Sequence, residues 1–156
     1  MQKKITKFQK SIVQKRLNSL ILIAILVVID QALKFAVTRV PPILEMSHLC
    51  NAGIAFGFKL MPQFILLLNI LILSWLIYCL VKKSRTNSSF LFIFALILLT
   101  AGAVSNTADR INFGCVIDYI DLKIWPVFNL ADTYISISFI LLIFHLLKEN
   151  KKAKKQ

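Results

Sequence analysis

Four long apolar runs limit what this chain of 156 residues can fold into. They lie at about 17–37, 61–81, 89–108 and 127–147. Each has about 20 residues, which at about 1.5 Å per residue spans the ~30 Å hydrocarbon core of a bilayer. Helices in the core of a soluble domain are usually shorter and have a polar face that these runs lack. The sequence therefore predicts an all-α membrane protein with four transmembrane helices, built as a single integral membrane domain over 1–156.

Basic residues are distributed unevenly over the segments outside these runs. The net charge is +12, and 14 of the 19 lysines and arginines lie in the tails 1–16 and 148–156 or in the loop 82–88. By the positive-inside rule, this bias places both termini in the cytoplasm and the loops 38–60 and 109–126 outside. The basic clusters then meet membrane lipids with anionic head groups. Without an aromatic or glycine-rich binding pattern they predict no nucleic-acid partner.

Acidic residues gather at the opposite end of the predicted spans. Six of the seven fall in or beside the outward segments, namely Asp30, Glu45, Asp109, Asp118, Asp121 and Asp132. A carboxylate near hydrocarbon is costly to keep ionised, so such a cluster suggests a functional site.

Two of the predicted helix ends carry polar residues at helical spacing. Asp30 and Lys34 are four residues apart on one helix face, so they either neutralise each other or take a direct part in a site. Asn106, Asp109 and Arg110 share a face near the end of the third run. Asp109 with Arg110 is either an interfacial ion pair that anchors the helix or part of the support of the site.

Two further carboxylates have both a simple and a functional interpretation. Asp132 opens the fourth run and can be a helix cap, although Asn129 can fill that role instead. Asp118 can be a solvated loop carboxylate. Together with Asn51, Asn106 and Asn129, they predict a polar pocket near the outer leaflet.

The chemistry of such a pocket follows from its residue types. It contains no Ser–His or Ser–Lys arrangement and no zinc-binding motif. Two carboxylates at close range cannot both ionise comfortably, so one keeps a proton. The anion can take a proton from an attacking water while the acid hydrogen-bonds to the amide carbonyl. This is aspartic-protease chemistry, and we expect neither metal nor cofactor.

The two outward loops contain candidate strands. Ile43–Phe58 combines β-forming residues with a turn at Asn51-Ala52-Gly53, and Ile117–Lys123 largely alternates apolar and polar residues. We expect them to pair into a small extracytoplasmic β element. Cys50 and Cys115 both fall in these loops and can pair, but an odd cysteine count argues against a disulfide framework, so we expect free thiols.

Four blocks of residues, in order, resemble the bacterial lipoprotein signal peptidases (signal peptidase II). They are Asp30-Gln31-x-x-Lys34; Asn51-x-Gly53-x-Ala55-Phe56-Gly57; Asn106-x-x-Asp109-Arg110 with Gly114 and Val116-Ile117-Asp118-Tyr119; and Phe128-Asn129-x-Ala131-Asp132. The resemblance implies that Asp118 and Asp132 are the catalytic pair of an intramembrane aspartic endopeptidase. It also implies residues that bind substrate or support the pocket, which are Asp30, Lys34, Asn51, Gly53, Asn106, Asp109, Arg110 and Asn129.

The resemblance further implies a four-helix bundle with a small sheet and a flap, located in the bacterial inner membrane. The implied substrate is a diacylglyceryl-modified prolipoprotein, cut just before the lipidated cysteine, and we expect a monomer. Leu33, Ile54 and Ser105 depart from the usual residues, and the first outer loop is short, which bears on the size of the sheet and flap.

Two other functional classes also use intramembrane polar residues. A small transporter or proton-conducting subunit would place its carboxylates nearer the middle of the bilayer. A structural subunit would use polar residues only to hold helices together. Cleavage of a lipidated peptide separates the three.

Overall fold

The computed structural model describes residues 2–39, 49–53, 62–83 and 89–153. In these ranges the chain forms α1 (Gln2–Arg39), β1 (Leu49–Asn51), α2 (Pro62–Lys83), α3 (Phe90–Phe113), β2 (Val116–Asp118) and α4 (Leu130–Ala153). All four helices contain a stretch long and apolar enough to cross a membrane. The predicted fold class, four transmembrane helices with a small β element, is therefore confirmed.

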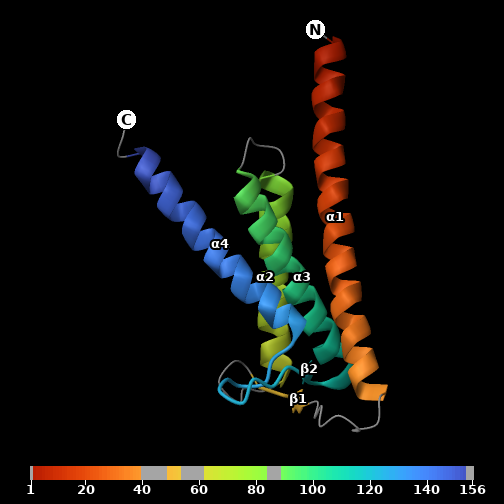
Figure 1. The fold of residues 1–156 in the computed structure, drawn as a ribbon. Coiled ribbons are helices and arrows are strands. Elements are labelled where there is room, and N and C mark those ends of the chain that lie inside the picture. Colours follow the sequence, from red (N-terminus) through yellow and green to blue (C-terminus); the bar gives the residue numbers. More distant parts are fainter. Residues whose placement is uncertain (1, 40–48, 54–61, 84–88, 154–156) are drawn as a thin grey trace.

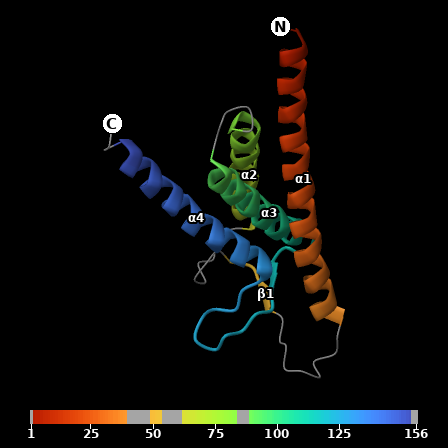
Figure 2. The same ribbon diagram turned by 45° about the horizontal axis from the view of Figure 1, so that its top comes forward.

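The helices lie side by side with the two strands at one end of the bundle (Figure 1). The start of α1 and the end of α4 both lie at the opposite end (Figure 1). From the sheet end, α4 leans away from α1, as both views show (Figure 2). The two strands, the ends of α1 and α3 and the starts of α2 and α4 therefore lie at the same end of the bundle.

The central helix of the bundle is α3. Within its apolar stretch 56% of the residues are buried, against 17% or less in the other three helices. Small residues allow this close packing. A Cβ added to Gly102 would lie 2.5 Å from the carbonyl oxygen of Ala131 and 2.7 Å from Ile135 Cγ1, so glycine is needed where α3 and α4 touch. The exposed apolar side chains of the outer helices form the surface that faces lipid.

Several helix boundaries differ from the apolar runs. The segment 1–16 was expected to be a tail, but α1 begins at Gln2 because no glycine or proline interrupts the sequence up to Arg39. The third helix continues past residue 108 to Phe113, where Gly114 takes a left-handed conformation (φ 74°) and donates its N–H to Arg110 O at 3.1 Å. The sequence Val40-Pro41-Pro42 follows α1, where proline lacks the amide donor and predicts the end of any helix, and it lies outside the described residues.

The two strands pair, as predicted. The pairing is antiparallel, with Leu49 opposite Asp118, Cys50 opposite Ile117, and Asn51 opposite Val116. The second strand ends sooner than the alternation over Ile117–Lys123 predicts. Asp121 Oδ1 accepts the N–H of Lys123 at 2.8 Å, and Lys123 has φ 63°, so a turn ends the extended backbone. The segments 43–48 and 54–58 of the other predicted strand lie outside the described residues.

The expectation of free thiols at the strands is wrong, because Cys50 and Cys115 form a disulfide. The antiparallel register places both side chains on one face of the ribbon, with Cα atoms 5.4 Å apart, which is a normal distance for a disulfide. Among the described residues, the free cysteine is Cys79 in α2. With three cysteines in the chain, one pair forms and Cys79 remains, so the odd number of cysteines was no argument against a disulfide.

Candidate active site

Asp118, at the end of β2, is held at both carboxylate oxygens by amide groups. Its Oδ1 accepts Nδ2 of Asn129 at 2.7 Å, and its Oδ2 accepts Nδ2 of Asn51 at 2.9 Å. The residue is only 2% exposed, so the solvated loop carboxylate considered from the sequence is not what the structure shows. Amides from β1 and from the start of α4 thus fix the orientation of this acid.

Asp132 lies in the first turn of α4, and Asn129 caps that helix. Asn129 Oδ1 accepts the N–H of Asp132 at 2.8 Å, while Asp132 Oδ2 accepts the N–H of Asn129 at 3.3 Å. This reciprocal pair is a capping box, with aspartate in place of the usual glutamate. The other oxygen, Oδ1, accepts Nδ2 of Asn106 from α3 at 2.8 Å. Asp132 therefore takes part in the cap and also faces α3.

Two asparagines connect the two acids. Asn129 binds Asp118 and also donates to Oδ1 of Asn106 at 3.2 Å, and Asn106 in turn binds Asp132. Lys34 of α1 donates to the same Asn106 oxygen at 3.1 Å. The carboxylates thus belong to one hydrogen-bonded network that spans three helices and the sheet.

Both acids line one cleft of about 290 Å³. Its wall also includes Asn51, Gly53, Asn106, Arg110, Trp125 and Phe128. Arg110 Nη2 donates to the carbonyl oxygen of Gly53 at 3.2 Å, which ties the turn after β1 to the end of α3. The cleft is large enough for an extended stretch of peptide backbone, and its polar groups converge on the two acids.

Burial raises the pKa of Asp118 to about 6, from an ordinary 3.8. The hydrogen bond from Asn51 opposes this shift, the nearby Asp132 carboxylate adds to it, and the hydrogen bond from Asn129 opposes it. At a pH where an exposed aspartate is fully ionised, Asp118 can still hold a proton. A buried acid of this kind is suited to proton transfer near neutral pH.

A buried charge cluster supports the site from behind. Lys34 Nζ lies 2.8 Å from Oδ2 of both Asp30 and Asp109, and all three residues are at most 1% exposed. Asp30 Oδ1 accepts the N–H of Ala131 at 3.0 Å, and Asp109 Oδ2 accepts the N–H of Ile117 at 3.2 Å. The cluster thereby attaches α1 to the start of α4, and α3 to β2. The ion-pair partner of Asp109 is Lys34, where the sequence suggested Arg110.

Three supporting residues were not singled out as site residues from the sequence. Gln31 Nε2 donates to Asp109 Oδ1 at 2.7 Å and to Ser105 Oγ at 2.9 Å, and Ser105 donates to Asp30 Oδ2 at 2.5 Å. The Tyr119 hydroxyl accepts the N–H of Leu130 at 3.3 Å. The sequence could have pointed to Gln31 and Ser105 as supporting residues, because each is polar, lies within a predicted span and is within four positions of an acid. Tyr119 stands beside Asp118 in one of the blocks that carry the resemblance, but its position there predicts no role for it.

In the part of the chain that the structure describes, no three His, Cys, Asp or Glu side chains are grouped so that they could hold a metal ion. Two carboxylates, the amides of Asn51 and Asn106 and one guanidinium line the cleft, and the buried amide of Asn129 holds Asp118 from behind.

Comparison with known proteins places these residues in a family. The family model described as signal peptidase (SPase) II matches residues 22–148. A lipoprotein signal peptidase of Pelotomaculum thermopropionicum is 35% identical over 151 residues, covering 87% of this chain and 95% of that relative. One from Staphylococcus aureus is 38% identical over 153 residues, covering 86% and 92%. A solved structure described as a bacterial membrane enzyme superposes with a TM-score of 0.75 at 28% identity, covering 89% of this chain and 93% of that one.

Proposed function

The chain belongs to the signal peptidase II family of aspartic membrane peptidases, and on this premise we propose that it removes signal peptides from prolipoproteins. The proposed substrate carries a diacylglyceryl group on a cysteine, and the bond cut lies just before that cysteine. The proposed catalytic pair is Asp118 and Asp132.

The observation that carries the proposal is the placement of the two acids in one cleft, joined through Asn106 and Asn129. Such a network fixes both carboxylates before substrate arrives, so little reorganisation is needed during reaction. A structural subunit would not need two acids aimed into a shared cleft. A transporter is also disfavoured, because the acids lie at the strand end of the spans (Figure 1).

The environments of the acids suggest which one carries the proton. Burial favours the protonated form of Asp118, which leaves Asp132, in the first turn of α4, as the proposed base. In the proposed reaction, Asp132 takes a proton from water as the water oxygen attacks the carbonyl carbon. Asp118 gives its proton to the carbonyl oxygen, and a gem-diol forms.

The second half of the reaction reverses these proton transfers. The proton held by Asp132 goes to the leaving nitrogen as the C–N bond breaks. One hydroxyl of the gem-diol returns its proton to Asp118, which leaves a new carboxyl and a free amine. Both acids recover their starting states, and one water is consumed.

We propose that the cleft opens on the outer side of the inner membrane. The start of α1 and the end of α4 lie at the end of the bundle opposite the strands (Figure 1). Most of the basic residues of the sequence lie in or next to these two segments, which the positive-inside rule assigns to the cytoplasm. A disulfide beside the site also suits an oxidising compartment. Near the cleft, Leu122, Ile124 and Trp125 are 54%, 91% and 58% exposed, and this apolar surface can rest among the lipid chains.

Cleavage of a synthetic diacylglyceryl-modified peptide by the purified protein tests the proposal. Asp118→Asn and Asp132→Asn should each abolish cleavage, because each removes a proton-transfer group at nearly constant volume. Asp121→Asn is the matched control, since Asp121 is exposed and pairs with Lys123 on its own loop. Substantial cleavage by either catalytic variant would contradict the assignment.

A further inference from the structure

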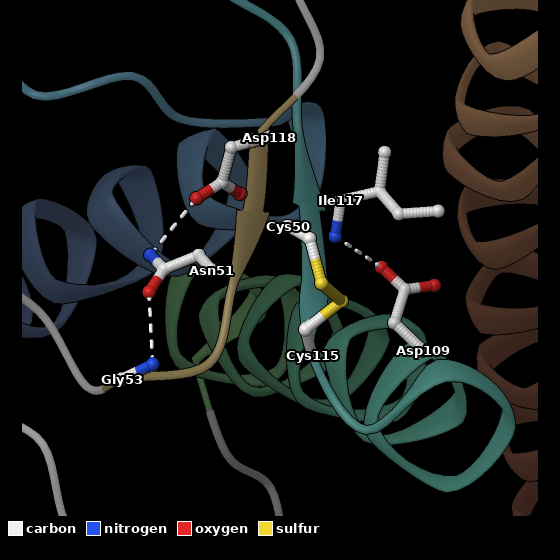
Figure 3. The surroundings of a disulfide bond; sticks show 7 residues. All are labelled: Cys50, Asn51, Gly53, Asp109, Cys115, Ile117 and Asp118. Carbon is white, nitrogen blue, oxygen red and sulfur yellow. Dashed lines mark hydrogen bonds between the residues drawn. A yellow bond between two sulfur atoms is a disulfide. The ribbon is translucent and has the colours of Figure 1, made fainter.

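The disulfide is attached to the same short strand that contacts a catalytic acid. Cys50 is followed directly by Asn51, whose Nδ2 donates to Asp118 Oδ2 and whose Oδ1 accepts the N–H of Gly53 at 3.0 Å (Figure 3). Alternate residues of a strand point to opposite faces. The pairing therefore puts the disulfide on one face of the ribbon and Asn51 with Asp118 on the other.

The backbone pairing that keeps β1 in place is short. The strand has three residues and pairs with one partner strand, also of three residues. A two-stranded ribbon is marginally stable on its own in water. The bond from Cys50 to Cys115 joins β1 to the residue just before β2, across 65 residues of sequence. It therefore opposes separation of the strands and slippage of their register.

We propose that the Cys50–Cys115 disulfide is a positioning device of the active site, which keeps the Asn51 amide on the Asp118 carboxylate. This inference rests on the proposed function and deepens it. Neither sulfur takes part in the reaction. The bond acts through Asn51, so its loss removes one of the two amide groups that orient Asp118.

Loss of the hydrogen bond between Asn51 and Asp118 should change the pKa of Asp118 in a direction that can be measured. The hydrogen bond from Asn51 is the largest influence that lowers the pKa of Asp118. The other charged groups around this acid come from different elements: Asp132 from α4, Lys34 from α1 and Arg110 from α3. All three side chains are carried by helices, so we expect them to stay in place when the disulfide opens, and Arg110 keeps its hydrogen bond to the carbonyl oxygen of Gly53 just after β1. The pKa of Asp118 should then rise.

Reduction of the folded, purified enzyme tests the proposal. With both thiols quantified, we expect kcat to fall about tenfold, the size expected for one hydrogen bond to the carboxylate that forms as Asp118 gives up its proton, with KM within about twofold. Because the reaction needs protonated Asp118, the alkaline limb of the pH profile should move to higher pH. Cys79→Ala is the control and should respond to reductant like the unaltered enzyme, since Cys79 lies in α2 outside the disulfide.

Variants separate positioning from a general structural role. The double variant Cys50→Ala, Cys115→Ala should match the reduced enzyme and no longer respond to reductant. Asn51→Ala should lose about as much activity as reduction causes, and reduction of that variant should add little, because both changes remove the same contact. A merely structural disulfide would lower the melting temperature without moving the pH profile, and its effect would add to that of Asn51→Ala.

Two outcomes would overturn the inference: an unchanged kcat and pH profile in the fully reduced enzyme, or full additivity of reduction with Asn51→Ala. Titration of the Asp118 carboxyl by NMR, with and without reductant, gives the same answer without substrate. If the oxidised enzyme fails to cleave lipidated peptide, the proposed function fails, while the titration still decides the role of the disulfide.

Discussion

Lys34 of α1 and Asp109 of α3 form a buried ion pair, with Nζ 2.8 Å from Oδ2. Asp30 shares the same ammonium group at the same distance. Two carboxylates and one lysine therefore lie together away from solvent, directly behind the residues that hold the two acids of the cleft. The stability of the whole site depends on this cluster.

Replacing Lys34 with methionine should be strongly destabilising. The change keeps the volume but leaves two buried carboxylates without their cation, which costs roughly 3–5 kcal/mol. Thermal unfolding in detergent measures the effect. Lys123→Met is the matched control, because Lys123 and Asp121 are also 2.8 Å apart but the lysine side chain is 79% exposed. We expect the control to cost at most about 1 kcal/mol, and equal losses in the two variants would contradict the importance of burial.

Asp118 should give the protein a recognisable dependence of stability on pH. Its pKa is raised from 3.8 to about 6 on folding, so the folded state binds the proton more tightly between these values. This contribution is present at pH 4 and is lost as pH rises through 6. Asp118→Asn cannot ionise, so its melting temperature relative to the unaltered protein should increase from pH 4 to pH 8. A difference that is constant with pH would show that Asp118 is not shifted upward.

Loss of both proposed catalytic acids should be little worse than loss of one. In the proposed reaction Asp118 and Asp132 transfer protons together, so either Asn substitution should disable the pair as a unit. Single-turnover cleavage of lipidated peptide by the two single variants and the double variant measures this. Substrate binding should persist in all three, because lipid and helix contacts lie outside the pair. Clearly additive losses would mean that the acids act in separate steps.

Gly102→Ala should weaken both the fold and catalysis. The added methyl would collide with the Ala131 carbonyl, one residue before Asp132, so α4 must shift outward. Overpacking of this kind costs about 1–3 kcal/mol. Gly102→Ser should be no better, because the hydroxyl adds bulk at the same place. The melting temperature and kcat of each variant should both fall. If Gly102→Ala changed neither quantity, close packing of α3 against α4 at this position would not be needed for stability or catalysis.

The membrane orientation can be tested with fusions to the C-terminus. Basic segments are retained on the cytoplasmic side, so the charge of the tails and of the loop 82–88 predicts that a fluorescent protein fused after Gln156 folds in the cytoplasm and fluoresces. Alkaline phosphatase fused at the same place should be inactive, since it needs export. The reverse pattern would place the cleft on the cytoplasmic side.

The sequence predicted the helices well at their centres and poorly at their ends. Hydrophobicity locates the part of a helix that lies in lipid but not where the helix stops. At the start of α4, Val127 and Phe128 belong to the apolar run, yet Phe128 exchanges backbone hydrogen bonds with Ile120 and the helix begins at Leu130. Asn129 marked the true start, because its side chain can cap a helix and those of its apolar neighbours cannot.

The candidate site was predictable as a set of residue types but not as a network. Spacing placed Asp30 with Lys34 because a helix fixes that distance. No local rule could pair Lys34 with Asp109, or Asn51 with Asp118, since these contacts depend on how separate elements pack. The Cys50–Cys115 pair was a possibility that the odd cysteine count argued against, and the register between the strands, which decides it, is not visible in the sequence.

The first turn of α4 is completed entirely by other parts of the chain and by its own cap. Its first three N–H groups, those of Leu130, Ala131 and Asp132, are accepted by Tyr119, Asp30 and Asn129. Starting a helix is the costly step of its formation, so these acceptors favour that turn only once α1 and the residue after β2 are in place. Asp132 lies in this turn. The proposed acid pair therefore forms only as α1, the sheet and α4 assemble, which couples the proposed activity to completion of the fold.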